Sequence, residues 1–296
     1  MEEINPIIQE ENTPTPNTKR PLTFWKGVGY GLVILVSQIV VGGIVAAVAM
    51  GSSGIDEDNL NPEEMMTNMM DWIMGIALPV SFILAVVVLL RRRKLHPRAL
   101  KWHSSHFVLL LLGLVMLAGF DYLVGELMTF LPNYESMLED YKSMFEGIDM
   151  KYLLIGGVFI GPICEEIIFR GIIEEGFIET YGGPTAVLYS AIIFGVIHLL
   201  PLQVVNAFLA GILLGWIYWK TRSLWIVMIL HILNNYLAFR FSDFDTTSVR
   251  EWLGNDTLYW FTFPLAVLIM YGAYRLFDQI SAKNNQKNEI AEDALP

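Results

Sequence analysis

The sequence predicts an all-α, polytopic membrane bundle of about eight transmembrane helices. Hydrophobic residues make up 54% of the 296 residues and charged residues only 17%, and the mean hydropathy is +0.48. The apolar residues also fall in runs of about twenty, the length at which a helix crosses a bilayer. Two soluble domains, which the length alone would allow, fit this composition less well.

The charge balance and the cysteine count narrow the function further. Lys and Arg number 19 against 30 Asp and Glu, a formal net charge of −11. This balance argues against broad affinity for nucleic acid, which is therefore not an expected partner. The single cysteine, Cys164, excludes an intramolecular disulfide and a cysteine-based zinc or iron–sulfur centre, so a metal would need His and carboxylate ligands.

The chain divides into a polar start, an apolar body and a polar end. Residues 1–23 are polar and lack a short cleavable apolar stretch, so we expect a disordered tail that is retained. Residues 24–277 are expected to form the transmembrane bundle, and residues 278–296 a second disordered tail. The eight apolar runs of the bundle are Phe24–Met50, Trp72–Leu90, Phe107–Leu131, Tyr152–Phe177, Pro184–Leu200, Leu202–Trp219, Leu224–Phe241 and Leu258–Phe277.

The basic residues predict the orientation of these runs. With the N-terminus inside, Lys and Arg collect in the inner segments, and Arg170 lies within the fourth run. The positive-inside rule therefore predicts a multi-pass protein of the cell membrane with both termini cytoplasmic. Loops 51–71 and 132–150 are then external and acidic. The basic residues that fall in outer segments are Lys142, Lys151, Arg240 and Arg250.

The fourth run carries ionisable residues, which are rare in a membrane span and indicate function or tight pairing. Glu165 and Glu166 point to different faces of a helix, and Glu166 has the i,i+4 spacing for an ion pair with Arg170. Glu174 is also four residues from Arg170 and could compete. Pro162 is expected to kink or start a helix. We interpret Glu166 and Arg170 as structural and Glu165 as the residue available for chemistry.

Two of the five histidines lie in apolar surroundings, His198 in the fifth run and His231 in the seventh. His231 and Asn235 share a helix face, so both could donate hydrogen bonds to a developing oxyanion, or they could satisfy each other. Counted from the inner membrane boundary, Glu165, His198, His231 and Asn235 lie at depths of ~20, ~22, ~12 and ~18 Å, which allows one shared site.

Three motifs follow one another within residues 150–240. They are E-E-x-x-x-R (Glu165, Glu166, Arg170), F-x-x-x-H (Phe194, His198) and H-x-x-x-N (His231, Asn235). In this order they resemble the CAAX-processing and bacteriocin-processing (CPBP, or Abi) family of intramembrane endopeptidases. The resemblance implies a protease core at about residues 150–240, in which Glu165 and His198 activate a water. It also implies that His231 and Asn235 stabilise the oxyanion, with Glu166 and Arg170 as structural support.

The sequence leaves open whether this hydrolysis uses a metal ion. One carboxylate and two imidazoles, from Glu165, His198 and His231, could hold a catalytic zinc, and the family is often labelled a metalloprotease. The sequence has no H-E-x-x-H motif, and a Glu165 bound to metal would be less free to act as a base. We favour a metal-free mechanism with zinc as the alternative. Cys164 lacks a dedicated partner, which disfavours a nucleophilic thiol.

The expected function is hydrolysis of a peptide bond in a membrane-associated protein or peptide, with the bilayer as surroundings. We expect the cavity to face the cytoplasmic side or the lateral lipid. One alternative is a proton-coupled transporter in which Asp121 and Glu126 form a relay with Glu165, although interhelical hydrogen bonding is the plainer explanation of these two acids. Another is a catalytically idle binding or immunity protein. The resemblance does not name a substrate.

Overall fold

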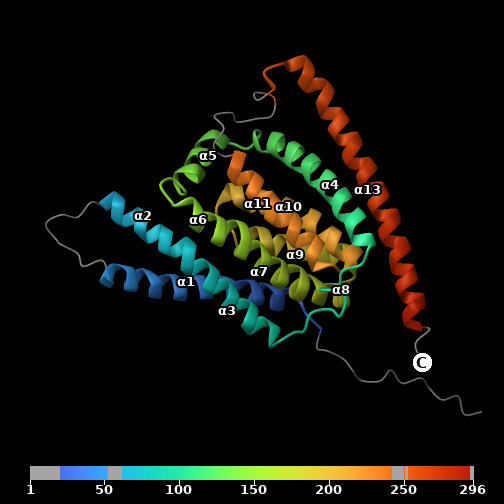
Figure 1. Ribbon diagram of the computed structural model, residues 1–296, viewed down its shortest axis with the longest axis horizontal. Coiled ribbons are helices and arrows are strands. Elements are labelled where there is room, and N and C mark those ends of the chain that lie inside the picture. The colour runs from blue at the N-terminus through green and yellow to red at the C-terminus, as the bar shows by residue number, and fades with distance from the viewer. Residues whose placement is uncertain (1–20, 53–61, 242–249, 251–252, 294–296) are drawn as a thin grey trace, which may run out of the picture.

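The computed structural model describes residues 21–52, 62–241, 250 and 253–293. Throughout that part of the chain the regular elements are helical, without a strand. Figure 1 shows the helices gathered in one bundle, with α13 running along one side. In chain order the helices are α1 (Phe24–Ser52), α2 (Pro62–Trp72), α3 (Leu78–Leu90), α4 (Ser105–Met128), α5 (Tyr134–Ser143), α6 (Met150–Leu153), α7 (Gly161–Glu166), α8 (Glu175–Tyr181), α9 (Gly183–Val196), α10 (Pro201–Thr221), α11 (Leu224–Phe241) and α13 (Asp256–Asp293).

Six helical stretches are long and apolar enough to cross a membrane. They are most of α1, the Met65–Leu90 stretch through α3, α4, the Met150–Tyr181 stretch from α6 to α8, α10, and most of α13. The shorter apolar helices α9 and α11 occupy the two remaining predicted runs. The predicted polytopic helical bundle is therefore confirmed, with six full-length spans among its eight apolar segments.

Two segments predicted as external loops contain helices instead. α2 lies within the predicted loop 51–71, and α5 lies within the predicted loop 132–150. Both are amphipathic rather than uniformly apolar, which is why a search for twenty-residue apolar runs does not find them.

The C-terminal segment also differs from the prediction, because α13 continues past residue 278 to Asp293 where a disordered tail was expected. The Lys220 ammonium pairs with Asp278 (2.6 Å), and the Asn285 side chain donates a hydrogen bond to the Lys220 carbonyl oxygen (3.0 Å). These contacts attach the polar part of α13 to α10. The tail predicted over residues 1–23 falls almost wholly outside the described residues.

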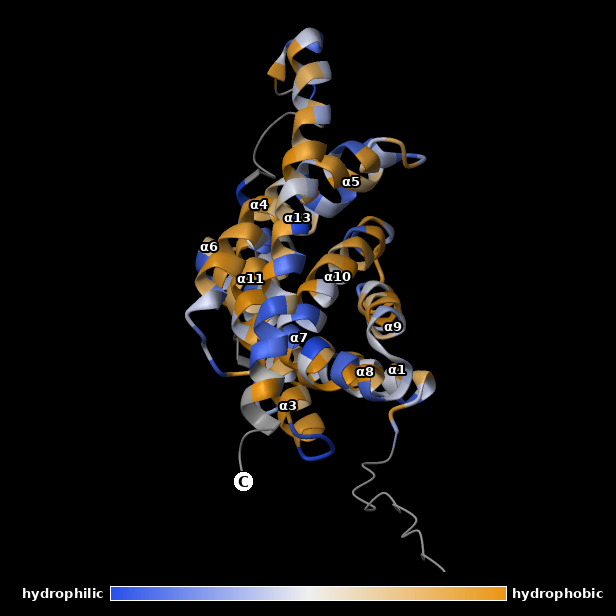
Figure 2. Cartoon of the chain, turned by 90° about the vertical axis from the view of Figure 1, so that its right-hand side faces the viewer, coloured by the Kyte–Doolittle hydropathy of each residue, from blue (hydrophilic) through white to orange (hydrophobic). Residues whose placement is uncertain are grey.

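The bundle has two buried apolar clusters. The first joins α1, α3, the stretch from α7 to α8, and α9, and the second joins α4, α10, α11 and α13. Many large apolar side chains on the outside of the bundle remain exposed, as expected for helices that face lipid. Figure 2 shows hydrophilic residues at opposite ends of the molecule, around α5 and in the loop beside α3.

The helices α9 and α10 form a tightly packed hairpin. A Cβ atom on Gly195 would lie 2.9 Å from the Val204 carbonyl oxygen, so a glycine is needed for this close approach. Leu199 adopts a left-handed conformation (φ 64°), and Pro201 begins α10 directly afterwards. The turn places His198 at the end of α9, beside the first turn of α10.

The stretch from α6 to α8 is not a regular α-helix. π-helical turns at Leu154–Ile160 and Ile167–Glu174 flank α7, and such turns often occur at functional sites. Pro162 lies in the first turn of α7, so the expected helix start is present there. A Cβ atom on Gly156 would lie 2.2 Å from the Met74 carbonyl oxygen, so only a glycine lets this stretch pack so closely on the span of α3.

Candidate active site

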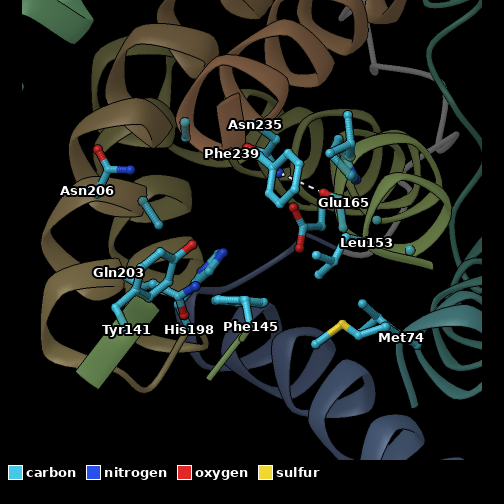
Figure 3. A pocket seen from close by; sticks show the side chains of 18 of the residues that line it. Met74, Tyr141, Phe145, Leu153, Glu165, His198, Gln203, Asn206, Asn235 and Phe239 are labelled. Carbon is cyan, nitrogen blue, oxygen red and sulfur yellow. Dashed lines mark hydrogen bonds between the residues drawn. The ribbon is translucent and has the colours of Figure 1, made fainter. Parts of the chain in front are cut away.

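A cavity of about 900 Å³ lies inside the bundle, between α1, α3, α5, the stretch around α7, and α9 to α11. Glu165, His198, His231 and Asn235 all line it. The structure therefore brings the four predicted catalytic residues, from α7, from the turn after α9 and from α11, to one cavity. Figure 3 labels Glu165, His198 and Asn235 among them.

Behind the cavity wall lies a buried charge network. The Arg170 guanidinium donates a hydrogen bond to Glu166 Oε1 (2.8 Å), and His231 Nδ1 lies 2.7 Å from the same oxygen. The side chains of Glu166 and Arg170 are almost fully buried. Glu174 is buried too, but its carboxylate makes no hydrogen bond to any described residue, so Glu166 is the partner of Arg170.

The network fixes the orientation of the His231 ring. A carboxylate bonded to Arg170 accepts hydrogen bonds, so the His231 nitrogen that faces it, Nδ1, carries a proton. The other ring nitrogen, Nε2, then points towards Glu165 and lies 3.7 Å from its Oε2. That distance is too long for a direct hydrogen bond. Glu165 makes no hydrogen bond within the described part of the chain, so the second acid of the motif is committed to the network and the first is open to the cavity.

Asn235 is positioned by a backbone feature that Pro162 creates. The Gly161 amide bonds to the Gly156 carbonyl oxygen, and Pro162 has no N–H to donate to the next carbonyl group. The Gly157 carbonyl oxygen is thus left without its helical donor, and the Asn235 amide donates to it (3.0 Å). One N–H of Asn235 is used in this way, and its second N–H remains available to the cavity. Asn235 and His231 do not simply satisfy each other.

The Phe194 ring joins the two histidines. It lies 4.8 Å from the His198 ring and 5.8 Å from the His231 ring, and the Arg170 guanidinium lies over it at 4.6 Å. His198 Nδ1 lies 2.7 Å from the Phe194 carbonyl oxygen. A carbonyl oxygen can only accept, so Nδ1 of His198 is protonated and the neutral ring leaves Nε2 as an acceptor. Figure 3 shows that the His198 and Glu165 side chains both face the cavity.

The three predicted zinc ligands do not form a metal site. Over the described residues, no group of three His, Cys, Asp or Glu side chains is arranged to hold a metal ion. In each histidine Nδ1 is engaged, with the Phe194 carbonyl group for His198 and with Glu166 for His231, so only the two Nε2 atoms and the Glu165 carboxylate could bind a metal, and these groups are not arranged to hold one ion. The candidate set of Glu165, His198 and His231 therefore does not fit a zinc ion in this arrangement.

The two acids of α4 and the cysteine lie outside the cavity lining. Cys164 is buried beside Glu165 and is not part of the lining. Asp121 and Glu126 of α4 do not line the cavity either. Glu126 accepts a hydrogen bond from the Tyr259 hydroxyl group of α13 (3.1 Å), which is the interhelical bonding considered for it. The proposed relay with Glu165 has no support in this geometry.

The sequence interpretation missed several polar lining residues. Gln38 of α1, Gln203 and Asn206 of α10, and Tyr141 of α5 all face the cavity. Burial raises the pKa of Tyr141, and its interaction with Gln203 offsets part of that rise. The three carboxamides could have been found in the sequence, because they are polar residues inside apolar runs. Tyr141 could not, because it lies on α5, a helix that the sequence did not predict.

The cavity lies towards one end of the bundle. Its lining includes Glu139, Phe145 and Met150, from the segment predicted to be external, and no residue of the basic segment 91–101. An opening on the cytoplasmic side is therefore inconsistent with the predicted orientation of the chain. Lateral access from the lipid remains consistent with it.

Comparisons with known proteins cover this core. Residues 148–237 match a family model described as "Type II CAAX prenyl endopeptidase Rce1-like". A protein of Bacillus subtilis (strain 168), "Putative membrane peptidase YdiL", is 24% identical over 174 residues, which cover 54% of this chain and 69% of that protein. No solved structure matches the chain significantly. The family match includes all seven motif residues, and the two matches confirm the predicted resemblance to the CPBP family.

Proposed function

We propose, from the assignment of the core to the CPBP family of membrane proteases, that this protein hydrolyses a peptide bond in a membrane-associated protein or peptide. Residues 150–240 would form the protease core of the bundle. The observation that carries the proposal is the position of Glu165. It lines the cavity without a hydrogen-bond partner in the described structure, 3.7 Å from an imidazole that a buried ion pair orients.

Glu165 acts as the general base, with His198 as the second group that holds the water. The Glu165 carboxylate takes a proton from the water as its oxygen bonds to the peptide carbonyl carbon. His198 Nε2 is the acceptor that positions the other water hydrogen. The C–N bond then breaks as Glu165 returns the proton to the leaving nitrogen, so one water is consumed and no covalent enzyme intermediate forms.

His231 and Asn235 stabilise the negative charge on the carbonyl oxygen. When His231 is doubly protonated, Nε2–H can donate to the oxyanion, and the Glu166 carboxylate stabilises the imidazolium from behind. The second N–H of Asn235 supplies another donor. Both donors are oriented before the substrate binds, which is the condition under which such hydrogen bonds favour the transition state.

The orientation of the chain decides how a substrate arrives. We propose that both termini are cytoplasmic, as the positions of the basic residues indicate. Because the cavity is lined by residues 139–150, the substrate enters from the lipid or from the external end. Labelling of single cysteines at Glu139 and at Leu100 from either side tests this orientation, and labelling of the Glu139 position only from the cytoplasm would contradict it.

A cleavage assay with purified protein tests the catalytic assignment. Quenched peptides and co-expressed membrane proteins are offered to wild type, to Glu165→Gln and to Cys164→Ala, each with and without a chelator. We expect cleavage by wild type and Cys164→Ala, with or without chelator, and loss of cleavage in Glu165→Gln. If the chelator abolished cleavage and added zinc restored it, the metal-free mechanism would be contradicted. Absence of cleavage by wild type on all substrates would favour the idle binding protein.

A further inference from the structure

Three carboxamides from apolar spans face the cavity, and none of them belongs to the family motifs. They are Gln38 of α1 and Gln203 and Asn206 of α10. Gln203 interacts with Tyr141 of α5. Gln38 and Asn206 make no hydrogen bond within the described part of the chain. Since a carboxamide without a partner is costly in an apolar environment, these two side chains need a ligand or water in the cavity.

The cavity face of α10 is built for close approach of a chain. Gln203, Asn206, Ala207 and Ala210 recur at helical spacing, so they form one stripe along the cavity wall. The two alanines carry no side chain beyond Cβ, which leaves space beside the carboxamides. Figure 3 shows Asn206 and Gln203 on α10, across the cavity from Glu165 and Asn235.

A peptide segment in this cavity loses its own hydrogen bonds. A helix hides its carbonyl groups in the N–H···O=C ladder, so the segment to be cut must be unwound, and each freed peptide group then needs a new partner within the membrane. A carboxamide offers a donor and an acceptor side by side, and it can therefore pair with the C=O and N–H groups of an extended main chain.

We propose that Asn206 binds the substrate main chain, pairing with one peptide group close to the scissile bond, and that Gln38 binds a second peptide group. This inference rests on the proposed protease function and adds the substrate-binding wall to it. Recognition through the main chain selects for extended segments over intact helices. It is independent of the side chain at the residue that Asn206 contacts.

Backbone-modified substrates test this pairing. A cleaved peptide is remade as a series in which one amide near the scissile bond is replaced by an ester, which removes the N–H donor and weakens the carbonyl acceptor. For the parent peptide we expect Asn206→Leu to raise KM about 10-fold, the effect of one lost hydrogen bond, with little change in kcat. One ester position should raise KM for wild type and cause no further rise in Asn206→Leu. Gln38→Leu should show the same behaviour at a different ester position.

The control is Asn285→Leu, the same substitution at a carboxamide that bonds the Lys220 carbonyl oxygen far from the cavity. It should keep the wild-type KM for every peptide. An unchanged KM in Asn206→Leu, or esters that affect Asn206→Leu as much as wild type, would overturn the inference. Failure of the proposed function has a different signature, which is cleavage that persists in Glu165→Gln.

Discussion

Two helix pairs of this bundle each carry two acids within a membrane span, and they treat those acids differently. Between α4 and α13, Glu126 is buried and both of its oxygens accept hydrogen bonds, from the Tyr259 hydroxyl group (3.1 Å) and the Arg250 amide (3.2 Å). Between α7 and α11, one oxygen of Glu166 (Oε1) is bonded by Arg170 and His231, whereas the neighbouring Glu165 lies 3.7 Å from His231 Nε2 and opens to a cavity.

The difference teaches that an acid in a membrane span does not by itself indicate catalysis. In the α4–α13 pair, hydrogen bonds offset the cost of burying the Glu126 carboxyl group, so this acid serves stability. In the α7–α11 pair, Arg170 and His231 both bond to Glu166. The Glu165 carboxylate therefore remains available to a substrate or water. The predictions below separate the two pairs by substitution.

The largest effect is expected for His231→Ala in the α7–α11 pair. The change removes the group that faces Glu165 and the proposed oxyanion donor, so kcat should fall by roughly 10²–10⁴-fold. Steady-state kinetics on the purified variant measure this. Because the two residues act as a unit, the double variant with Glu165→Gln should lose little more than either single variant. Losses that multiply would instead indicate independent roles.

Arg170→Met should destabilise the same pair. The substitution leaves the buried Glu166 carboxylate with His231 as its partner, and breaking a buried ion pair in this way costs about 3–5 kcal/mol of unfolding free energy. Denaturant unfolding in detergent measures the change. Removing both charges, as in Arg170→Met with Glu166→Gln, should recover part of the loss. A double variant that is no more stable than Arg170→Met would show that the unpaired Glu166 charge does not cause the loss of stability.

A smaller effect is expected in the α4–α13 pair. Tyr259→Phe removes one hydrogen bond to Glu126 and should cost about 1–3 kcal/mol of stability. The cleavage rate of the folded protein should remain that of wild type, because neither residue lines the cavity. Equal unfolding midpoints for wild type and Tyr259→Phe would mean that this bond does not hold the pair together.

The smallest effect concerns an exposed acid. Asp149 lies before α6, and its hydrogen bonds to Lys151, together with the Lys151 charge, lower its pKa from the ordinary 3.8. Its contribution to stability is therefore present above that value and is lost as the pH falls through the lowered pKa. The stability advantage of wild type over Asp149→Asn, measured from pH 6 downwards, should shrink below about pH 4. A difference that persists to lower pH would exclude this charge effect.

The apolar runs located the six candidate membrane spans and the two shorter apolar helices, because long runs of apolar residues have few other structures available to them. The amphipathic helices α2 and α5 were not predicted, because their polar faces interrupt the runs of apolar residues. The helical continuation of α13 depends on contacts with α10, such as that of Asn285 with Lys220, which no local pattern contains.

The sequence predicted that Glu165, His198, His231 and Asn235 would lie close together, and all four line one cavity. Local rules predicted the Glu166–Arg170 pair because it lies within one helix turn. The contact of His231 with Glu166 joins residues 65 positions apart and could not be read from spacing. The same holds for Asn235 and the Gly157 carbonyl oxygen, whose availability depends on a proline five residues later. Whether Glu165, His198 and His231 could converge on a metal depends on helix orientation, which sequence spacing does not give, and within the described residues they form no such group.

One paired measurement tests the central claim that Glu165, which faces the cavity without a hydrogen-bond partner in the described structure, catalyses and that Glu126, which has partners, stabilises. Glu165→Gln and Glu126→Gln carry the same substitution in two spans, so cleavage rate and unfolding free energy are measured for both beside wild type. The account predicts that Glu165→Gln lowers kcat by roughly 10²–10⁴-fold at unchanged stability, and that Glu126→Gln loses about 1–3 kcal/mol of stability at unchanged kcat. Retained cleavage by Glu165→Gln, or abolished cleavage by a folded Glu126→Gln, would contradict it.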